Sequence, residues 1–405
     1  MVFMKYFFFT LLFAPIFIFA NQIDDDDEVE SKSSKQKTAT PIAISGYAQI
    51  RYDNLFSTNP DLNCAQCDQA WGGDTKFSFR RLRPTFYGNL TNNIYYNIQP
   101  DFATSVVDGK LHSMELKNAY FDIGFDDDKV FRVRLGQSKI PYGMEIMQSS
   151  ANRIALDRSD GINSAFKNER DLGAFFYWTP KHIQKIFKRI KDDRLSGYGN
   201  YGIFGFGVFN GQTANKPEIN SNKHIVTRVS YPFEIKDQIL EVSLQAYTGK
   251  YTLPAKDISA GVIVSNNGEY LDQRAAVSVI LYPQPFGILA EYNIGKGPEF
   301  NKSINSITLQ NLNGGFILFN YKFDIAKTIL LPYMRFQYYD GGKKHELDAR
   351  SYTVKELDLG IEWQASDVFE LTAEYNISNR RYEDYINRDN HQIGNLLRLQ
   401  AQINY

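Results

Sequence analysis

Cysteine is scarce in this chain of 405 residues, which contains only Cys64 and Cys67. A small secreted protein that depends on several disulfides is therefore excluded. An excess of charge of one sign is also missing, because 45 basic residues stand against 46 acidic ones and the net charge is −1. This balance argues against a nucleic-acid-binding protein, which normally carries a clear basic excess.

Long apolar runs are missing too, apart from one near the start of the chain. With a mean hydropathy of −0.38, the chain is too polar for a bundle of transmembrane helices. Aromatic residues, in contrast, are abundant: 30 Phe and 26 Tyr, with only 3 Trp, bring the aromatic content to 15%. A polar, aromatic-rich chain is what a transmembrane β-barrel requires, because half of its strand residues face water inside the barrel.

The first twenty residues contain the parts of an export signal. Lys5 precedes an apolar run from Tyr6 to Phe19, and the small residue Ala20 follows. The run is short for a membrane span, so we predict a signal peptide over residues 1–20, with a retained signal anchor as the alternative. Residues 21–40 include the acidic run Asp24–Asp27 and little to bury, which predicts a flexible tail rather than a divalent-cation site.

Residues 41–405 are predicted to form one all-β domain. Between Leu397 and Tyr405, apolar side chains occupy every second position and polar side chains lie between them. Residues 356–363 and 369–377 alternate in the same way, with almost no charge on one face and full charges on the other. A soluble sandwich also alternates, but this asymmetry favours lipid outside and water inside. The aromatic C-terminus resembles the closing strand of bacterial outer-membrane barrels.

The links between these segments fall into two classes, which predict a barrel of about sixteen antiparallel strands with both termini on the periplasmic side. Tight links are predicted at Thr91–Asn93, Asp126–Lys129, Lys236–Gln238, Gln284–Pro285, Asp324–Lys327 and Gln364–Asp367. Long links are predicted at Leu55–Thr75, Lys139–Arg170, Gly211–Asn222, Tyr251–Leu271 and Pro298–Asn311.

One link departs from this rule. Pro180–Leu195 falls on the short-turn side, yet Ile183, Ile186, Phe187 and Ile190 recur at helical spacing among six Lys and Arg. This pattern fits a basic amphipathic helix on the membrane surface, and a longer periplasmic excursion without a role is the alternative.

No catalytic constellation is found in the sequence. The five histidines are scattered without metal-ligand spacing, and neither a Gly-x-Ser-x-Gly elbow nor a phosphate-binding glycine loop is present. We therefore expect no enzyme activity, no cofactor and no metal. Cys64 and Cys67 lie in the first long link, where a local disulfide is a better explanation than a redox or zinc site.

Several motifs follow one another in the first half of the chain. They are Phe79–Pro84, Leu116–Tyr120, Arg134–Glu145, Ser149–Ser150, Asp157–Ser159 and Glu169–Gly173. Together they resemble the phosphate-selective porin O and P family of Gram-negative outer membranes. The resemblance implies a sixteen-stranded transmembrane β-barrel, usually a homotrimer, whose third long loop folds inward to narrow the pore. Here that loop is Lys139–Arg170, the longest link.

Pore selectivity is predicted from the charges at inward-facing strand positions. The basic ones are Arg51, Arg81, Arg83, Arg132, Arg134, Arg228, Arg274, Arg335 and Arg398, and the acidic ones are Asp101, Asp122, Glu241, Glu291, Asp358, Glu362 and Glu374. Arginine suits the bidentate capture of phosphate-like anions, whereas a structural ion pair is the competing explanation for each arginine. The clustering of basic residues in early strands and acidic residues in late ones predicts opposite charges on opposite walls, unlike the arginine ladder of phosphate-specific members.

The sequence therefore predicts an outer-membrane porin, a passive channel for small hydrophilic solutes with a preference for anions such as phosphate. The predicted anion-binding residues are Arg81, Arg83, Arg132, Arg134, Lys139, Arg158 and Arg170. The expected partners are outer-membrane lipids, small anionic or neutral solutes and two further copies of the chain, and no nucleic acid. A barrel that acts mainly as an adhesin or structural protein through its long external loops is the alternative. The register predicts Phe121, Ile123, Leu359 and Ile361 to face lipid.

Overall fold

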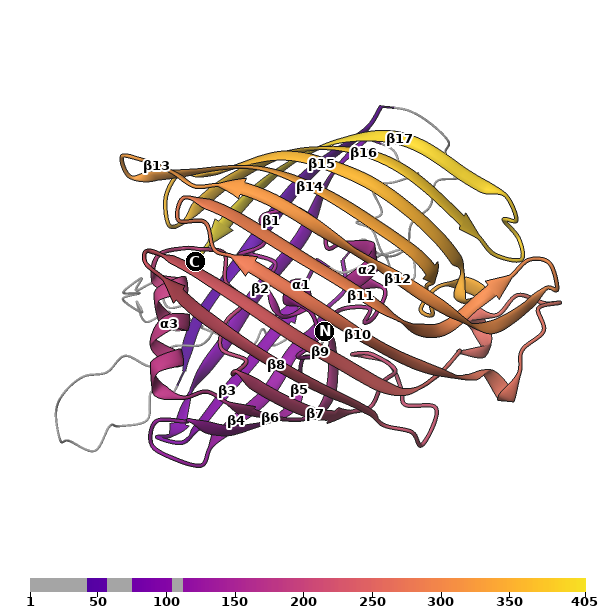
Figure 1. The fold of residues 1–405 in the computed structure, drawn as a ribbon, viewed down its shortest axis with the longest axis horizontal. Coiled ribbons are helices and arrows are strands. Elements are labelled where there is room, and N and C mark those ends of the chain that lie inside the picture. Colours follow the sequence, from indigo (N-terminus) through magenta and orange to yellow (C-terminus); the bar gives the residue numbers. More distant parts are fainter. Residues whose placement is uncertain (1–41, 57–74, 104–111) are drawn as a thin grey trace, which may run out of the picture.

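The computed structural model describes residues 42–56, 75–103 and 112–405 (Figure 1). The predicted signal peptide and flexible tail, residues 1–40, lie outside the described residues, as do Cys64 and Cys67 with their expected disulfide.

Strands make up most of the described chain. The first eight are β1 (Ala43–Leu55), β2 (Lys76–Thr91), β3 (Ile94–Asp101), β4 (Glu115–Gly124), β5 (Phe131–Lys139), β6 (Arg170–Trp178), β7 (Phe204–Phe209) and β8 (His224–Ile235). The others are β9 (Gln238–Thr252), β10 (Glu269–Leu281), β11 (Phe286–Asn301), β12 (Ser306–Tyr321), β13 (Phe323–Ile325), β14 (Thr328–Gly342), β15 (Ser351–Gln364), β16 (Phe369–Glu383) and β17 (Asn390–Asn404). The helices are α1 (Met144–Met147), α2 (Asp160–Asn163) and α3 (Lys181–Asp192), with single 3-10 turns at Ala255–Asp257, Asn266–Gly268 and Leu347–Ala349.

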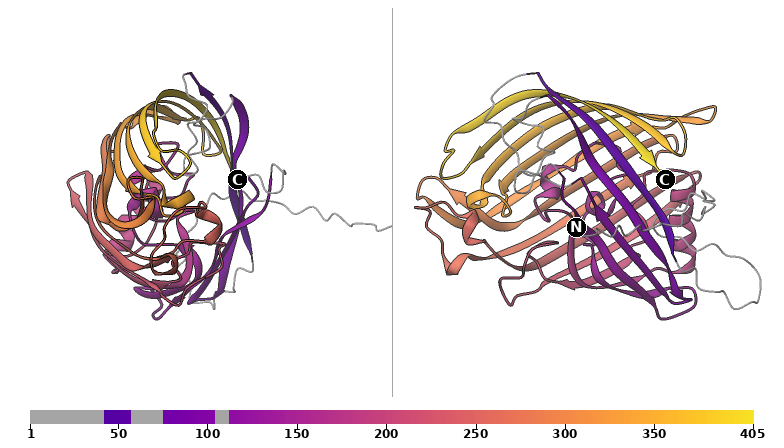
Figure 2. Two further views of the ribbon diagram at one scale, coloured as in Figure 1. Left: turned by 90° about the vertical axis from the view of Figure 1, so that its right-hand side faces the viewer. Right: turned by 180° about the vertical axis from the view of Figure 1, so that it is seen from behind.

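The strands form one closed antiparallel barrel. Each strand pairs with its neighbours in the sequence, and β1 pairs with β17, so the described sheet has no free edge. β12 and β13 are two parts of one strand interrupted at Lys322, since both pair with β14. Counted in this way, the barrel has the predicted sixteen strands. Figure 2 shows the strands inclined to the long axis, as closure requires.

The register agrees with the alternation in the sequence. Phe121 is 48% exposed while its neighbour Asp122 is 4% exposed, and Leu359 is 42% exposed while Asp358 is fully buried. Ile361 is exposed in the same way as Leu359. Because a one-residue shift would exchange the two faces of a strand, these values confirm the predicted register.

The links also follow the predicted pattern, with one correction. The chain turns within two residues between β2 and β3, between β8 and β9, and between β13 and β14. Pro298–Asn311, however, is not a long link, because β11 and β12 remain paired up to Asn301 and Ser306. A strand that extends beyond the membrane carries polar side chains on its outward face, so its composition resembles that of a loop.

The basic segment on the short-turn side forms α3. Its apolar residues Ile183, Ile186, Phe187 and Ile190 are all buried, in one cluster with Tyr198 and Tyr201 of the following segment. The predicted helix is therefore confirmed, but its placement on the membrane surface is wrong, because protein covers its apolar face. Among the described residues, no helix combines the length and the hydropathy of a membrane span.

Contacts from α3 and residues 193–194 reach turns in different sectors of the barrel. They join Lys181 to Asp128, Arg189 to Glu234, Arg194 to Asp367, and the backbone oxygen of Asp193 to Lys322. These partners belong to the β4–β5, β8–β9, β15–β16 and β12–β13 connections or the strand ends beside them. The segment therefore crosses the short-turn end of the barrel, the end at which Figure 1 shows both α3 and the C-terminus.

Candidate functional site: the barrel interior

The segment between β5 and β6, residues 140–169, is fastened to β11 through its backbone. Gly143 precedes α1 with a φ of 75°, a conformation that favours glycine. After this turn, the backbone N–H groups of Met144 and Glu145 donate hydrogen bonds of 2.5 and 2.9 Å to the carboxylate of Glu291. Part of the Arg134–Glu145 motif thus serves to attach this segment to a strand far along the chain.

The side chain of Glu145 ties two parts of the same segment to the barrel wall. It accepts hydrogen bonds of 2.8 Å from the backbone N–H and the hydroxyl of Ser159. It also lies 3.1 Å from Arg335 of β14, which in turn lies 2.7 Å from Asp358 of β15. All four side chains are buried, so this ionic network is well shielded from water.

Two aspartates attach the segment to later strands. Asp157 forms an ion pair with Arg398 of β17, and Asp160 lies 2.5 Å from Lys343 and 2.9 Å from Arg380 of β16. Burial alone would raise the pKa of each aspartate, but the neighbouring cations outweigh burial and hold both pKa values well below the usual range. Both aspartates are therefore ionised at neutral pH.

The helix α2 lies directly against the wall. A Cβ atom added to Gly161 would come within 2.8 Å of backbone atoms of Gly314 and Gly315 in β12, so a larger residue could not fit without a shift. At the C-terminal end of α2, the hydroxyl and carbonyl oxygens of Ser164 accept hydrogen bonds of 2.7 and 3.1 Å from Arg274 of β10. Backbone contact and side-chain contact therefore hold α2 at the same place.

Four of the predicted anion-binding residues form ion pairs, and two of them, Arg83 and Arg134, each pair with a carboxylate on a neighbouring strand. Arg134 makes two hydrogen bonds of 2.7 Å to the two carboxylate oxygens of Asp122 and lies over the ring of Tyr120 at 3.9 Å. Arg83 lies 2.7 Å from Asp101. For these two arginines the competing explanation, a structural pair, describes the contacts.

Other predicted residues gather around one carboxylate, that of Glu169. Arg158 and Arg170 lie 2.6 and 2.7 Å from its two oxygens. Arg81 and Lys139 lie near enough for electrostatic interaction with the same group. Burial would raise the pKa of Glu169, but Arg158 and Arg170 outweigh it and hold the pKa well below its usual value. This group of side chains is strongly positive in sum.

Three of the predicted cations bind only neutral oxygen atoms among the described residues. The contacts join Arg81 to the side chain of Gln49 at 2.8 Å, Lys139 to the backbone oxygen of Met147 at 3.0 Å, and Arg132 to the backbone oxygen of Asn200. No described carboxylate lies within ion-pairing distance of these three side chains.

Sequence analysis missed two interior arginines. Arg153 donates hydrogen bonds to the backbone oxygens of Ala155 and Leu156, and burial lowers its pKa to about 10. It also interacts electrostatically with Arg81 and Glu169, and Arg83 interacts with the same carboxylate, which makes six basic side chains around it. Arg380 lies beyond the alternating stretch 369–377 of the sequence, although the inward phase continues through β16.

The charges on the two walls are not separated as predicted. Late strands carry the buried arginines Arg335, Arg380 and Arg398, and each of these forms an ion pair with a carboxylate. The acidic side chains of this wall are thus largely neutralised by neighbours. The predicted opposition of charged walls is wrong, because ion pairs form locally between adjacent strands and the segment 140–169.

A cavity of about 800 Å³ lies between the segment 140–169 and α3. Arg132, Arg134 and Lys139 line it, as do basic side chains of α3 and the carboxylates of Glu362 and Glu370. The other four predicted residues, Arg81, Arg83, Arg158 and Arg170, do not line this cavity. The described residues contain no group of three or more His, Cys, Asp or Glu side chains that could hold a metal ion.

Solved structures with a similar fold are outer-membrane proteins. The channel DcaP of Acinetobacter baumannii has a TM-score of 0.54 and 11% identity, with 90% of this chain and 97% of that chain covered. OmpF of Salmonella typhi has a TM-score of 0.53 and 12% identity, with the same coverage. The trimer form of OmpT from Vibrio cholerae has a TM-score of 0.51 and 9% identity, with 90% and 99% covered. At such identities the likeness concerns the fold alone.

Sequence comparison gives the family. No curated protein matches the chain. The family model described as phosphate-selective porin O and P matches residues 61–405, which include all the motifs described above from Phe79 to Gly173. With most of its length matched in this way, the chain belongs to the phosphate-selective porin O and P family.

Proposed function

We propose that this protein is a passive diffusion channel for small hydrophilic solutes with a preference for anions such as phosphate. Family membership makes the chain a porin of the Gram-negative outer membrane. The anion preference rests on one observation, the six basic side chains Arg81, Arg83, Lys139, Arg153, Arg158 and Arg170 around the single carboxylate of Glu169.

The segment 140–169 is the part that narrows the pore in this proposal. Its contacts support a position inside the lumen, because its partners are the inward-facing side chains Glu291, Arg335 and Arg398 of three separate strands. A segment attached to both nearby and distant strands leaves the solute a restricted path. The Glu169 cluster lies at the base of this segment, where it would act on solutes at the narrowest region.

The charges around the passage favour anions, and opposing charges limit how strong this preference becomes. Cations in a narrow, low-dielectric passage concentrate anions, and guanidinium groups match two oxygens of a phosphate at once. The carboxylates of Glu362 and Glu370 line the cavity on the short-turn side and oppose this effect. A moderate anion preference is therefore expected rather than strict phosphate specificity.

Single-channel recordings in planar bilayers test the proposal. Under a KCl gradient, the wild-type reversal potential should show anion selectivity, and added phosphate should reduce the chloride current. Arg81→Gln combined with Lys139→Gln should shift the reversal potential toward cation selectivity, because two unpaired charges are removed while hydrogen bonding is retained. Lys250→Gln, at an exposed ion pair near the long-loop end of β9, is the single-charge control and should leave selectivity unchanged.

An unchanged reversal potential in the folded double variant would reject the Glu169 cluster as the selectivity region. Protein that never opens a pore would favour the other candidate, a barrel that acts as an adhesin or structural protein.

We assign no catalytic role to the protein. We further propose a homotrimer, supported by the trimer form known for the similar OmpT structure.

A further inference from the structure

The outward face of the barrel changes from apolar to polar near the long-loop end of β14–β17. Leu359 pairs with Tyr375, and Leu357 pairs with Ile377, so both rows are apolar. The next two rows toward the long-loop end are polar or charged. Lys355 pairs with Asn379, and Thr353 pairs with Arg381. These residues continue the lipid-facing phase of their strands, so they lie on the outside of the barrel just beyond its apolar band.

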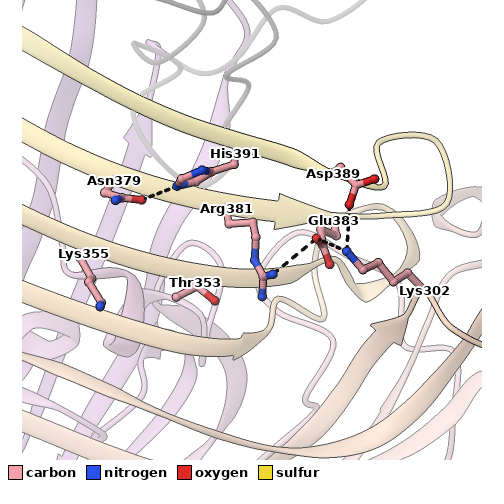
Figure 3. Close-up of a pocket in the computed structure, with 8 residues that line it drawn as sticks. All are labelled: Lys302, Thr353, Lys355, Asn379, Arg381, Glu383, Asp389 and His391. Atoms are coloured by element: carbon pink, nitrogen blue, oxygen red, sulfur yellow. Dashed lines mark hydrogen bonds and ion pairs between the residues drawn. The ribbon is translucent and has the colours of Figure 1, made fainter.

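A recess of about 480 Å³ lies on this outer wall (Figure 3). Strands β15, β16 and β17 contribute to it, together with the β11–β12 turn and the β16–β17 loop. The lining residues are Lys302, Thr353, Lys355, Asn379, Arg381, Glu383, Asp389 and His391. Both the turn and the loop belong to the rim opposite α3, so the recess lies at the external end of the barrel.

The basic groups of the recess are only partly neutralised. Lys302 lies 2.7 Å from Glu383 and 3.0 Å from Asp389, so it shares both carboxylates. Arg381 lies 3.7 Å from the same Glu383, and its side chain is 49% exposed. Lys355 is exposed and forms no ion pair with any of the described residues. Two cations on the lipid-facing side of adjacent strands are therefore available to an anionic group.

Their placement fits one phosphate. Lys355 pairs with Asn379, two residues before Arg381 on the same face, so the two cations are diagonal neighbours across β15 and β16. Long side chains at such positions reach a common point. A guanidinium offers two parallel N–H groups to phosphate oxygens, and an ammonium adds a point charge.

We propose that this recess binds a phosphate group of an outer-leaflet glycolipid. The phosphate would lie between Lys355 and Arg381, and the acyl chains would lie along Leu357 and Ile377 directly below. The continuity of the basic recess with the apolar band favours an amphiphilic lipid over a free anion, since a free anion would use only the upper part. Basic recesses beside a membrane surface commonly bind lipid headgroups in this way.

Native mass spectrometry of the full barrel in detergent tests this site. The probes are bis-phosphorylated lipid A, the same lipid without its phosphates, and inorganic phosphate. Wild-type protein should retain the phosphorylated lipid in preference to the dephosphorylated one, and excess inorganic phosphate should not displace it. Lys355→Gln combined with Arg381→Gln should weaken retention about tenfold, because two headgroup contacts are lost.

The matched control is Lys185→Gln combined with Lys236→Gln, which removes the same charge from exposed positions at the opposite rim. It should retain the lipid as the wild type does. Heat-modifiable gel mobility establishes that each variant is a folded barrel. Equal retention in the folded Lys355/Arg381 variant would overturn the proposal, as would displacement by inorganic phosphate. High-yield cross-linking of two copies through Arg381→Cys would also overturn it, by assigning the face to a subunit contact.

Discussion

Arg132 and Arg134 show how two identical side chains on one face of β5 acquire different roles. Arg134 is locked by two hydrogen bonds to Asp122 and lies over Tyr120. The guanidinium of Arg132 donates a hydrogen bond to the backbone oxygen of Asn200, which follows α3. Both arginines line the cavity beside α3. The first arginine neutralises a buried carboxylate, whereas the second forms no ion pair with a described carboxylate and lies over the ring of Tyr177.

Glutamate substitutions should separate these two roles. Arg134→Glu would place two carboxylates together in a buried site, and breaking a buried pair costs about 3–5 kcal/mol, so little folded barrel is expected. Arg132→Glu should fold and shift the reversal potential toward cations, an effect that high salt weakens by screening. Gel mobility and bilayer recordings measure the two outcomes. Normal assembly of Arg134→Glu would contradict the structural role of that pair.

For a single residue, the sequence predicts on which face of the strand the side chain lies but not which other residue it contacts. Alternation places Arg132 and Arg134 inside correctly, because strand periodicity is a local property. Whether an arginine meets a carboxylate depends on the register between strands and on segments that return from elsewhere. Arg398 pairs with Asp157, more than two hundred residues away, and no local pattern indicates that contact.

Among the elements, α3 is the one that crosses the short-turn end of the barrel. Its helical spacing is visible in the sequence, but its contacts with separate turns depend on barrel closure. Ile183→Ser combined with Ile190→Ser should undock α3, because each change removes a buried side chain worth about 2 kcal/mol or more. The barrel should still close, and single-channel conductance should rise and become noisier as the short-turn end opens.

The control uses the exposed face of the same helix. His182→Ser changes an exposed position of the helix that does not line the cavity, and it should leave the conductance close to that of the wild type. If the Ile183/Ile190 variant conducts as quietly as the control, α3 is not a restriction at this end of the pore.

The closing strand depends on its last residue. Tyr405 exchanges two backbone hydrogen bonds with Gly46 of β1, at 2.7 and 2.9 Å, and its ring is about half exposed on the outward side. Deletion of Tyr405 should lower the yield of folded barrel severalfold, because both hydrogen bonds and the interfacial aromatic are lost. Tyr405→Phe keeps the ring and the backbone and should assemble normally. Equal yields of the deletion and the wild type would contradict this role.

The ends of strands can be predicted from the sequence where the apolar alternation stops at the edge of the membrane. They are harder to predict where a strand continues beyond the membrane. The sequence predicts the short turns correctly because the apolar alternation stops at each of them. The paired region Pro298–Asn311 was mistaken for a loop because its strands continue past the lipid with polar side chains. The helix α3 lay in the one link whose periodicity changed, which revealed its conformation but not its position.

At the scale of the whole molecule, the segment 140–169 joins parts of the barrel that are distant in sequence. Its anchors reach β11 through Glu291, β14 through Arg335 and β17 through Arg398. The family motifs indicated that the segment matters, and their side chains are among those that hold it. Under the proposed function, the solute path beside this segment is sensitive to the protonation of its ionic anchors.

The sign of that sensitivity follows from Asp157 and Asp160. Their pKa values are held well below the usual range by Arg398 and Arg380, which outweigh the effect of burial. In the unfolded chain each carboxyl would protonate near about pH 3.9, so their stabilising contribution is complete above that pH and decreases as the pH falls below it. Single-channel recordings should therefore show a quiet channel from pH 7 down to about pH 5 and increased noise only below about pH 4.

Asn variants provide the comparison for this acid response. Asp157→Asn and Asp160→Asn lose the charge at every pH, so at pH 7 they should already show the noise that the wild type shows only in acid. Lys188→Gln, at an exposed ion pair on α3, is the control and should keep the wild-type acid response. If wild-type conductance changes between pH 7 and about pH 5, groups that titrate nearer neutrality control the pore. In that case another group, and not these two aspartates, sets the acid response of the channel.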